Sequence, residues 1–408
     1  MKKNGIIIVL IFLLFTSISP VWGSGTRLET LGYLTNYYII DSYNLWLFPS
    51  TIVDYNNKIF LESYTGNPLG AGGINLPVNP YVTIGIYLSD ENRSIKFADP
   101  ELAGNMANQR IDLFSGYRAD RFNFGVHFAT YLSKMEYSNP KDNKLNKNGE
   151  LNSNTFEGGV SYIPNENSRL DATVSYTNRG FLYEDASRDT SQIREPYGHH
   201  SIGLAARFLY SLSEKVVLVP FFNYTYHGEG YEFLVDQLQI TNNVRSMLEK
   251  DKMMTFGIAF NLIPREMVLV TCATGILSMS TQSEVSLIKG NAPVNNEQSY
   301  LVFPFVNIGL EADLLKWLGL RFSMYKLMQK LVQRTPVDAN TLDERNQYSN
   351  QYSATLGIYF RFGRLKIDTM LDTNNAANFL HNGPYLLSGK DYSATNLFTR
   401  VSVIYNFD

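Results

Sequence analysis

The strongest constraint on the fold is a two-residue alternation of apolar and polar side chains that recurs along the chain. In residues 81–88, Val82, Ile84 and Ile86 alternate with smaller or more polar residues. The same alternation occurs in residues 122–128, 156–162, 170–177, 201–210, 254–262 and 352–362. An α-helix repeats every 3.6 residues and could not keep these apolar sets on one side, so the segments are predicted to be β-strands.

The two faces of these strands differ in a way that indicates a membrane. The apolar face carries almost no charge, and glycine and alanine recur on the polar face. A charge that faces lipid at the midplane costs about 2–4 kcal/mol, whereas a soluble β-sandwich would be expected to place more lysine and glutamate on its outer faces. The 27 tyrosines and 25 phenylalanines fit strands with aromatic girdles at two interfaces. The pattern therefore favours an all-β, antiparallel transmembrane β-barrel.

The connections between the predicted strands alternate in length. Tight links occur at residues 117–122, 164–168, 211–215, 263–266, 314–318 and 363–365. Long polar stretches lie at residues 90–108, 138–153, 182–198, 229–251, 286–298, 334–350 and 374–392. Short turns on one side and long loops on the other are typical of an outer-membrane barrel, so the long set is predicted to be extracellular.

The last twelve residues, LFTRVSVIYNFD, are predicted to close the barrel, with Val401, Val403, Tyr405 and Phe407 toward lipid. Counting back from this strand gives fourteen strands, the first at residues 81–88, and this count is favoured. Residues 58–64 are then left over, before a Gly/Asn/Pro-rich stretch at 66–80. If residues 94–97 supply a partner strand, the count becomes sixteen and residues 58–64 pair with the closing strand.

The N-terminus predicts export. Lys2 and Lys3 precede an apolar run at residues 6–15, and the polar stretch after it ends at Gly23. This run is shorter than the roughly 20 apolar residues that span a membrane, so residues 1–23 are predicted to be a signal peptide, cleaved before Ser24. No cysteine lies near the cut, which disfavours a lipoprotein. Residues 24–57 lack clean alternation and are predicted to form an N-terminal plug or periplasmic segment, and residues 58–408 the barrel.

The composition of the chain limits the classes of molecule that it is expected to bind. Loss of Lys2 and Lys3 takes the formal net charge from −3 to −5, which is too balanced to indicate a nucleic-acid partner. The single cysteine, Cys272, excludes an internal disulfide framework. The expected partners are outer-membrane lipid, a small-molecule solute and the barrel assembly machinery, and the expected location is the bacterial outer membrane.

The sequence carries no catalytic motif. No phosphate-binding glycine loop, HExxH or CxxC occurs. The pair His199-His200 is too small a set to predict a metal site. His127 and His227 are the strand histidines that alternation turns inward, and neither has an obvious nucleophile beside it. We therefore predict no enzyme activity, no metal site and no cofactor.

Charged residues on the inward faces are candidates for the lumen. They are Glu157, Asp171, Arg179, Arg207, Glu311, Asp313, Arg321, Arg361 and Arg400. Because both signs are present, they can form a structural ion-pair network, which a buried charge requires. They can also form an eyelet that selects solutes by charge, and the sequence leaves both readings open.

Two predicted strands, residues 216–226 and 299–310, carry apolar residues on both faces. The candidates for an inward apolar pocket are Phe221, Leu301, Phe303 and Phe305. These residues could pack a plug, or they could line a pocket for an apolar ligand. Pro220 and Pro304 indicate bulges or a local break in strand pairing.

The whole chain resembles the bacterial outer-membrane β-barrel group through its signal peptide, alternating hairpins and aromatic final strand. That final signature usually ends on phenylalanine, whereas here Phe407 is followed by Asp408. Residues 41–50, DSYNLWLFPS, resemble more narrowly the plug motif of the FadL-type transporters of hydrophobic compounds. Their plug carries an acidic residue, an aromatic run and an Asn-Pro-Ala triplet, for which this chain has Phe48-Pro49-Ser50. The resemblance implies a plugged fourteen-stranded barrel that carries apolar small molecules, with plug residues Asp41, Trp46, Phe48 and Pro49.

Two functions from different classes follow. The first is passive uptake of small apolar or mixed solutes through a plugged lumen. The alternative is a closed surface barrel whose long extracellular loops serve adhesion or scaffolding.

Overall fold

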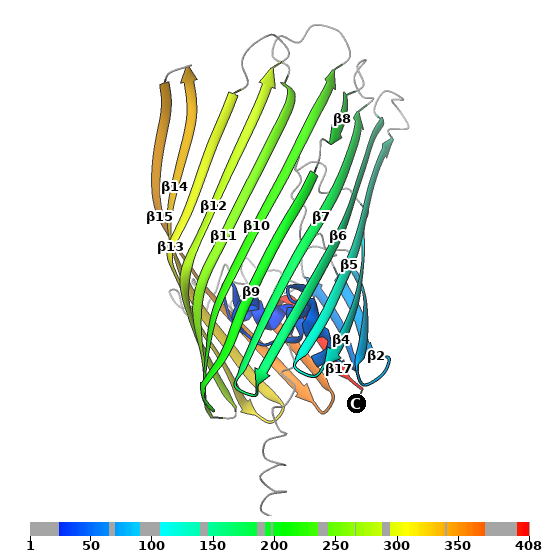
Figure 1. Ribbon diagram of the computed structural model, residues 1–408, viewed down its shortest axis with the longest axis vertical. Helices are drawn as coiled ribbons and strands as arrows, with labels where there is room; N and C mark the ends of the chain where they lie inside the picture. The colour runs from blue at the N-terminus through cyan, green and yellow to red at the C-terminus, as the bar shows by residue number, and fades with distance from the viewer. Residues whose placement is uncertain are drawn as a thin grey trace, which may run out of the picture.

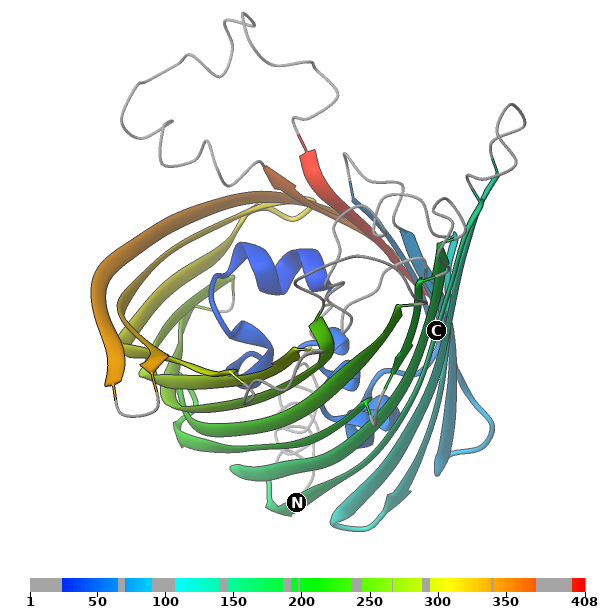
Figure 2. The ribbon, with the colours of Figure 1, turned by 90° about the horizontal axis from the view of Figure 1, so that it is seen from above.

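The computed structural model shows a closed antiparallel barrel with a helical N-terminal segment inside it (Figures 1 and 2). The structure describes residues 24–64, 70–89, 107–138, 146–185, 192–196, 199–235, 244–265, 267–287, 294–338, 341–371 and 398–407. The predicted signal peptide and residues 374–392 lie outside these ranges, as do parts of the other predicted long loops. The prediction of a long loop at 334–350 is wrong, because strands cover these residues except for 339–340, which are not described.

The N-terminal segment, residues 24–57, forms four short helices that Figure 2 shows in blue within the lumen. They are α2 (Gly25–Thr30), α3 (Thr35–Tyr38) and the 3-10 helices η1 (Ser42–Trp46) and η2 (Pro49–Asp54). Ser24 caps α2 by accepting from Arg27 N, and Asp41 caps η1 in a capping box with Asn44. Pro49 occupies the first position of η2, where no backbone donor is needed. None of the helices in the described part is long and apolar enough to cross a membrane.

Seventeen strands are present in the described residues, and sixteen of them close the barrel. They are β1 (Lys58–Tyr64), β2 (Gly70–Pro77), β3 (Val82–Ser89), β4 (Ala107–Ala119), β5 (Phe122–Ser138), β6 (Asn146–Asn165), β7 (Ser168–Asp185), β8 (Gln192–Pro196), β9 (His199–Ser213), β10 (Val216–Val235), β11 (Val244–Arg265), β12 (Val268–Leu287), β13 (Val294–Leu315), β14 (Leu318–Asp338), β15 (Thr341–Phe362), β16 (Leu365–Leu371) and β17 (Phe398–Asn406). Barrel strands pair in chain order, and β1 pairs with β17. The short β8 pairs with β7 and β10 beyond the start of β9.

The alternating segments form strands as predicted, and the observed strand number is the larger of the two considered. The favoured count of fourteen is replaced because β1 and β2 both belong to the wall. β2 was expected to be part of a Gly-rich loop, yet its glycines serve packing: a Cβ on Gly73 would lie 2.1 Å from Cδ1 of Tyr87, whose ring covers that position. Residues 94–97, the suggested partner strand, lie outside the described residues.

The final strand closes the barrel as its alternation predicts. β17 pairs with β1 in the register Leu61 opposite Val403. Its inward residues Arg400, Ser402 and Ile404 are buried, whereas Tyr405 is exposed on the outer face. The one-face assignment made from the sequence is therefore confirmed for this strand.

The outer face of the barrel is apolar. Its exposed side chains include Ile86, Leu88, Leu113, Phe124, Phe128, Phe156, Val174, Phe256, Ile308 and Phe362. A closed barrel has no free sheet edge and satisfies its backbone polar groups internally, which is what hydrocarbon requires. An apolar belt of this extent on such a barrel fits a surrounding lipid phase.

The wall is uneven in height. In the described residues, five neighbouring strands, β16, β17, β1, β2 and β3, have 7–9 residues each. The barrel strands from β5 to β15 have 15–22 residues and rise far above them (Figure 1). A membrane-spanning strand needs about 9–11 residues, and over the described residues the wall is shorter along this side of the barrel, which we call the low wall.

Candidate functional site

The predicted inward charges do not form one ring across the lumen. Instead they pair with one another, with further strand residues and with the N-terminal segment. Glu157 binds His127; Asp171 binds Arg169 and Arg207; Glu311 binds Arg27 and Arg321; Asp313 binds Tyr359 and Arg361; and Arg400 binds Glu29 and Glu62. Arg179 is half-buried on the lumen side of β7.

The densest group of charges surrounds Arg27 of α2, which is buried. Its Nη1 donates to Asp41 Oδ2 at 2.8 Å and its Nε donates to Glu311 Oε2 at 2.8 Å. Glu311 also accepts from Arg321, whose Nη1 lies 2.9 Å from Asp368 Oδ1. Burial raises the pKa of Asp41 to about 6, because the loss of water outweighs the attraction of the Arg27 guanidinium. These charges tolerate burial because each has an opposite partner.

A second group joins α2 to the junction between β1 and β17. Arg400 donates from Nε to Glu62 Oε1 at 2.8 Å and from Nη2 to Glu62 Oε2 at 2.7 Å. This is the two-point geometry in which arginine binds a carboxylate most strongly. The Thr26 backbone nitrogen donates to the same Glu62 Oε1 at 3.0 Å. The helix and both strands at the junction therefore share one hydrogen-bonded group.

A third group of charged and aromatic residues contacts Trp46, the last residue of η1. His127 is buried between Asp112 and Glu157, at 2.8 and 2.9 Å from its two ring nitrogens. Its ring stacks on Phe114 with centroids 4.0 Å apart, and Trp46 meets it edge-on at 5.7 Å. No nucleophile joins this arrangement, and the described residues contain no cluster of three or more His, Cys, Asp or Glu side chains suited to a metal. The His199 side chain lies outside the described part.

The residues singled out in the plug motif all contact the barrel. Phe48 is fully buried beneath the Arg207 guanidinium, 4.5 Å from its ring centre. Pro49 lies so close to Gly125 of β5 that a Cβ there would meet the Pro49 carbonyl carbon at 2.2 Å. Asp41 and Trp46 take part in the charged groups described above.

The inward apolar patch is occupied by the N-terminal segment. Phe221 stacks on Tyr37 with ring centroids 5.5 Å apart, and Phe305 meets Tyr33 edge-on at 5.7 Å. Both phenylalanines are buried in one apolar cluster with Tyr38. The packing interpretation of this patch therefore fits these two phenylalanines.

Leu301 and Phe303 were wrongly placed inward. They are 40% and 59% exposed and belong to the outer face. The register between β13 and β14 shifts between Val302 and Phe305, so an extra residue of β13 is accommodated at Pro304. This bulge reverses the alternation, and both Val302 and Phe305 face inward. Pro304 was the sequence signal for the bulge.

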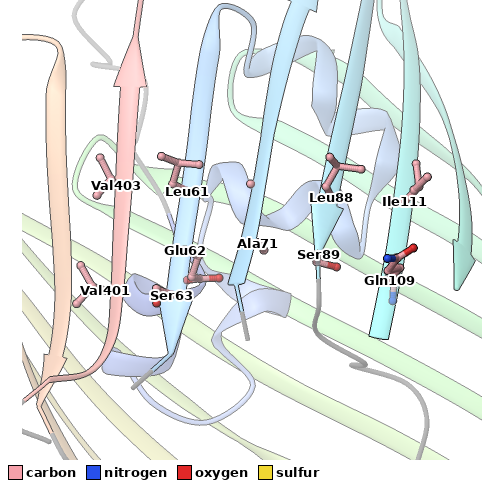
Figure 3. Close-up of a pocket in the computed structure, with 12 residues that line it drawn as sticks. Leu61, Glu62, Ser63, Ala71, Leu88, Ser89, Gln109, Ile111, Val401 and Val403 are labelled. Carbon is pink, nitrogen blue, oxygen red and sulfur yellow. The ribbon is translucent and has the colours of Figure 1, made fainter. Parts of the chain in front are cut away.

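A cavity of about 620 Å³ lies where β1 and β3 of the low wall end and β2 and β4 begin, in the lower part of Figure 3. Val403, Leu61, Leu88 and Ile111 lie in a row across neighbouring strands, as their register pairs require. Gly72 of β2 lies between Leu61 and Leu88 and leaves the middle of the row without a side chain. The remaining lining residues are Glu62, Ser63, Ala71, Ser89, Gln109, Arg110 and Val401. We call this cavity the rim pocket.

The rim pocket combines an apolar and a polar side. Leu61, Leu88 and Ile111 are exposed on the outer face, whereas Glu62 and Arg110 belong to the inward face. Its volume is within the range of about 300–1,000 Å³ usual for small-molecule sites, and a mostly apolar lining with a few polar groups is also usual. Sequence reasoning missed it because the pocket exists only once β17 is paired with β1.

Comparison with known proteins gives no family assignment. The structure is similar to a FadL homologue of Pseudomonas aeruginosa, at 11% identity and a TM-score of 0.44 over 91% of this chain and 96% of that one. It is also similar to the toluene transporter TodX of Pseudomonas putida, at 11% identity and a TM-score of 0.43 over 95% and 99%. The outer membrane receptor FauA of Bordetella pertussis shares 10% identity at a TM-score of 0.47, with 77% of this chain covering 60% of that chain's length. No family model and no curated protein matches the sequence. At these values the likeness carries no functional argument.

Proposed function

We propose that this protein is a passive transporter of the bacterial outer membrane for small apolar or mixed solutes, and that solutes pass through the rim pocket. The observation that carries the proposal is the position of the rim pocket at the low wall, between the apolar outer face and the lumen. A solute with an apolar body could rest against Leu61 and Leu88 while its polar end meets Arg110. No energy source or cofactor is required for this route.

We also propose that residues 24–57 act as a plug. Their helices contact strands around much of the barrel, including β4, β5 and β6 through η2 and β14 to β17 through α2. Buried ion pairs and an apolar cluster hold them there. A lumen filled in this way favours small solutes at the rim over bulk flow through the centre.

The rim pocket is tested by filling it. Gly72→Leu places a side chain in the middle of the apolar row, and its Cβ would lie 2.8 Å from Leu61 Cδ2. Gly158→Leu is the matched control, because a Cβ on Gly158 meets nothing within 4 Å. Flux of apolar, mixed and polar solutes into proteoliposomes should fall for Gly72→Leu and stay unchanged for Gly158→Leu. Equal flux in the two variants would remove the rim pocket from the route.

The plug is tested by single-channel conductance with and without residues 24–57. Deletion should raise conductance or solute flux in planar bilayers. Faster gel mobility of the unheated than of the boiled protein should confirm that each barrel is folded. Absence of flux for every solute class in both proteins would contradict transport and would favour the closed surface barrel with adhesive loops.

A further inference from the structure

Ser24, the first residue of the described chain, lies in the lumen rather than at the surface. Its side chain is buried, and its Oγ donates to Asp368 Oδ2 of β16 at 2.7 Å. The same Oγ accepts from Arg27 N at 2.9 Å. Only the Cα and Cβ atoms separate the Ser24 backbone nitrogen from this Oγ. A charge on that nitrogen would therefore stand beside the Asp368 carboxylate.

Asp368 also has capacity for another donor. Its carboxylate is fully buried. Its Oδ1 lies 2.9 Å from Arg321 Nη1 and 3.6 Å from Lys366 Nζ, and its Oδ2 accepts from Ser24 Oγ. An ionised carboxylate accepts about four hydrogen bonds, so a cation that can turn its donors freely would fit.

We propose that the Gly23–Ser24 bond is cut during export and that the Ser24 α-ammonium then forms a buried ion pair with Asp368. Hydrolysis consumes one water, leaves a carboxylate on Gly23 and releases the Ser24 amine, which takes up a proton. The signal peptide predicted from residues 1–23 supplies the cut, and the Asp368 carboxylate supplies the site. The pairing does not depend on what the barrel transports.

The ion pair offsets an unfavourable feature of the cut chain. A positive charge at the beginning of a helix opposes the helix dipole. Asp368 cancels that effect, and the Ser24 Oγ continues to cap α2. A chain that began two residues earlier would carry its α-ammonium away from Asp368. The ion pair therefore requires a cut directly before Ser24, and a cut at another bond would not form it.

The intact mass of protein purified from outer membranes should correspond to a chain that begins at Ser24. The α-amine should then react with an N-hydroxysuccinimide ester at pH 7 at least about tenfold more slowly than an unpaired terminus, since each unit of raised pKa removes tenfold of the free amine. Peptide mass spectrometry after timed labelling gives this rate.

Two variants test the ion pair, and the second separates it from simple burial. Duplication of Ser24-Gly25 keeps the residues around the cut and displaces the terminus, which should restore fast labelling. Asp368→Asn should shift the pH profile of labelling toward lower pH, whereas Asp313→Asn, at another inward carboxylate, should leave it unchanged. A different first residue, or equal labelling of the native and duplicated chains, would overturn the proposal. If Asp368→Asn gives no heat-modifiable barrel, equal labelling of the native and duplicated chains can still overturn the proposal.

Discussion

The two first helices of the N-terminal segment are held in the lumen by different chemistry. α2 is held by charge: Arg27 binds Asp41 and Glu311, and Thr26 binds Glu62. α3 is held by rings, with Tyr37 and Tyr38 packed against Phe221. The same short segment thus contains a polar and an apolar attachment a few residues apart.

The charged and apolar attachments contribute differently: one selects where the segment lies in the barrel, and the other supplies its binding free energy. The attraction within a buried ion pair offsets little more than the free energy of removing its two charges from water. It does, however, select which strands α2 can lie against. Apolar burial stabilises by about 25 cal/mol per Å² and accepts many arrangements. We therefore expect charges to fix the register of the segment and rings to supply most of its binding free energy. Docking can be followed by Trp46 fluorescence in urea, with Trp317→Phe removing the other tryptophan of the chain after Ser24.

Arg27→Met should weaken docking most, by about 3–5 kcal/mol, because it leaves Asp41 and Glu311 buried without this partner. Arg345→Met is the matched control, since that side chain is 77% exposed. An Arg27→Met barrel with an unchanged urea midpoint would show that charge does not hold α2.

Phe305→Ala should weaken docking by about 3 kcal/mol through the cavity it leaves beneath Tyr33. Phe303→Ala, two residues away on the outer face, should change docking by less than about 0.5 kcal/mol. Equal effects on the Trp46 transition would contradict the bulge at Pro304.

Tyr38→Phe should weaken docking by about 1–2 kcal/mol. The hydroxyl donates to the Tyr33 carbonyl oxygen at 2.9 Å and accepts from Asn307 Nδ2 at 2.8 Å. Removing one oxygen leaves the ring contacts in place, so this variant measures the polar part of the α3 attachment. A loss as large as that of Phe305→Ala would mean that α3 depends on hydrogen bonds more than on rings.

Docking should strengthen by about 1 kcal/mol between pH 7 and pH 5. Burial raises the pKa of Asp41 from 3.8 to about 6, so the docked segment binds a proton more tightly than the released one. The stabilisation is complete below pH 4 and is lost as pH rises through 6. Arg27, Lys366 and Asp368 are the charges that face this carboxyl. Asp41→Asn should abolish the slope, and a slope of opposite sign would contradict the assignment.

Sequence reasoning predicted the fold where side chains alternate and failed where a local feature breaks alternation. The sets around Val82 and Val401 were assigned correctly because only one face of a strand can meet lipid. β2 was not predicted, because its glycines are typical of turns. The need for glycine at position 73 becomes clear only in the structure, where the Tyr87 ring of β3 covers it. Pro304 indicates a bulge, but the spacing of residues 301–305 does not show that one extra residue places Val302 and Phe305 on the same face.

Alternation places the charged candidates on inward faces, but it predicts no individual pairs. Alternation turned Glu311 and Arg321 inward, yet nothing in their spacing indicates that Arg27 lies between them and Asp41. The rim pocket could not be predicted from the sequence, because it is lined by residues far apart in the chain. Leu61 and Val403 become neighbours only when the barrel is closed.

The junction of β1 with β17 imposes an order in time on assembly. Its polar group is completed by Thr26, Glu62 and Arg400, three residues drawn from the start, the first strand and the end of the chain. A chain that lacks its final strand has no Arg400, and one whose α2 is still outside has no Thr26 donor. The first cannot close its wall, whereas the second still closes through the backbone pairing of β1 with β17 and lacks only the donation from Thr26 to Glu62, so closure waits for the last strand to be made and docking of α2 can follow it.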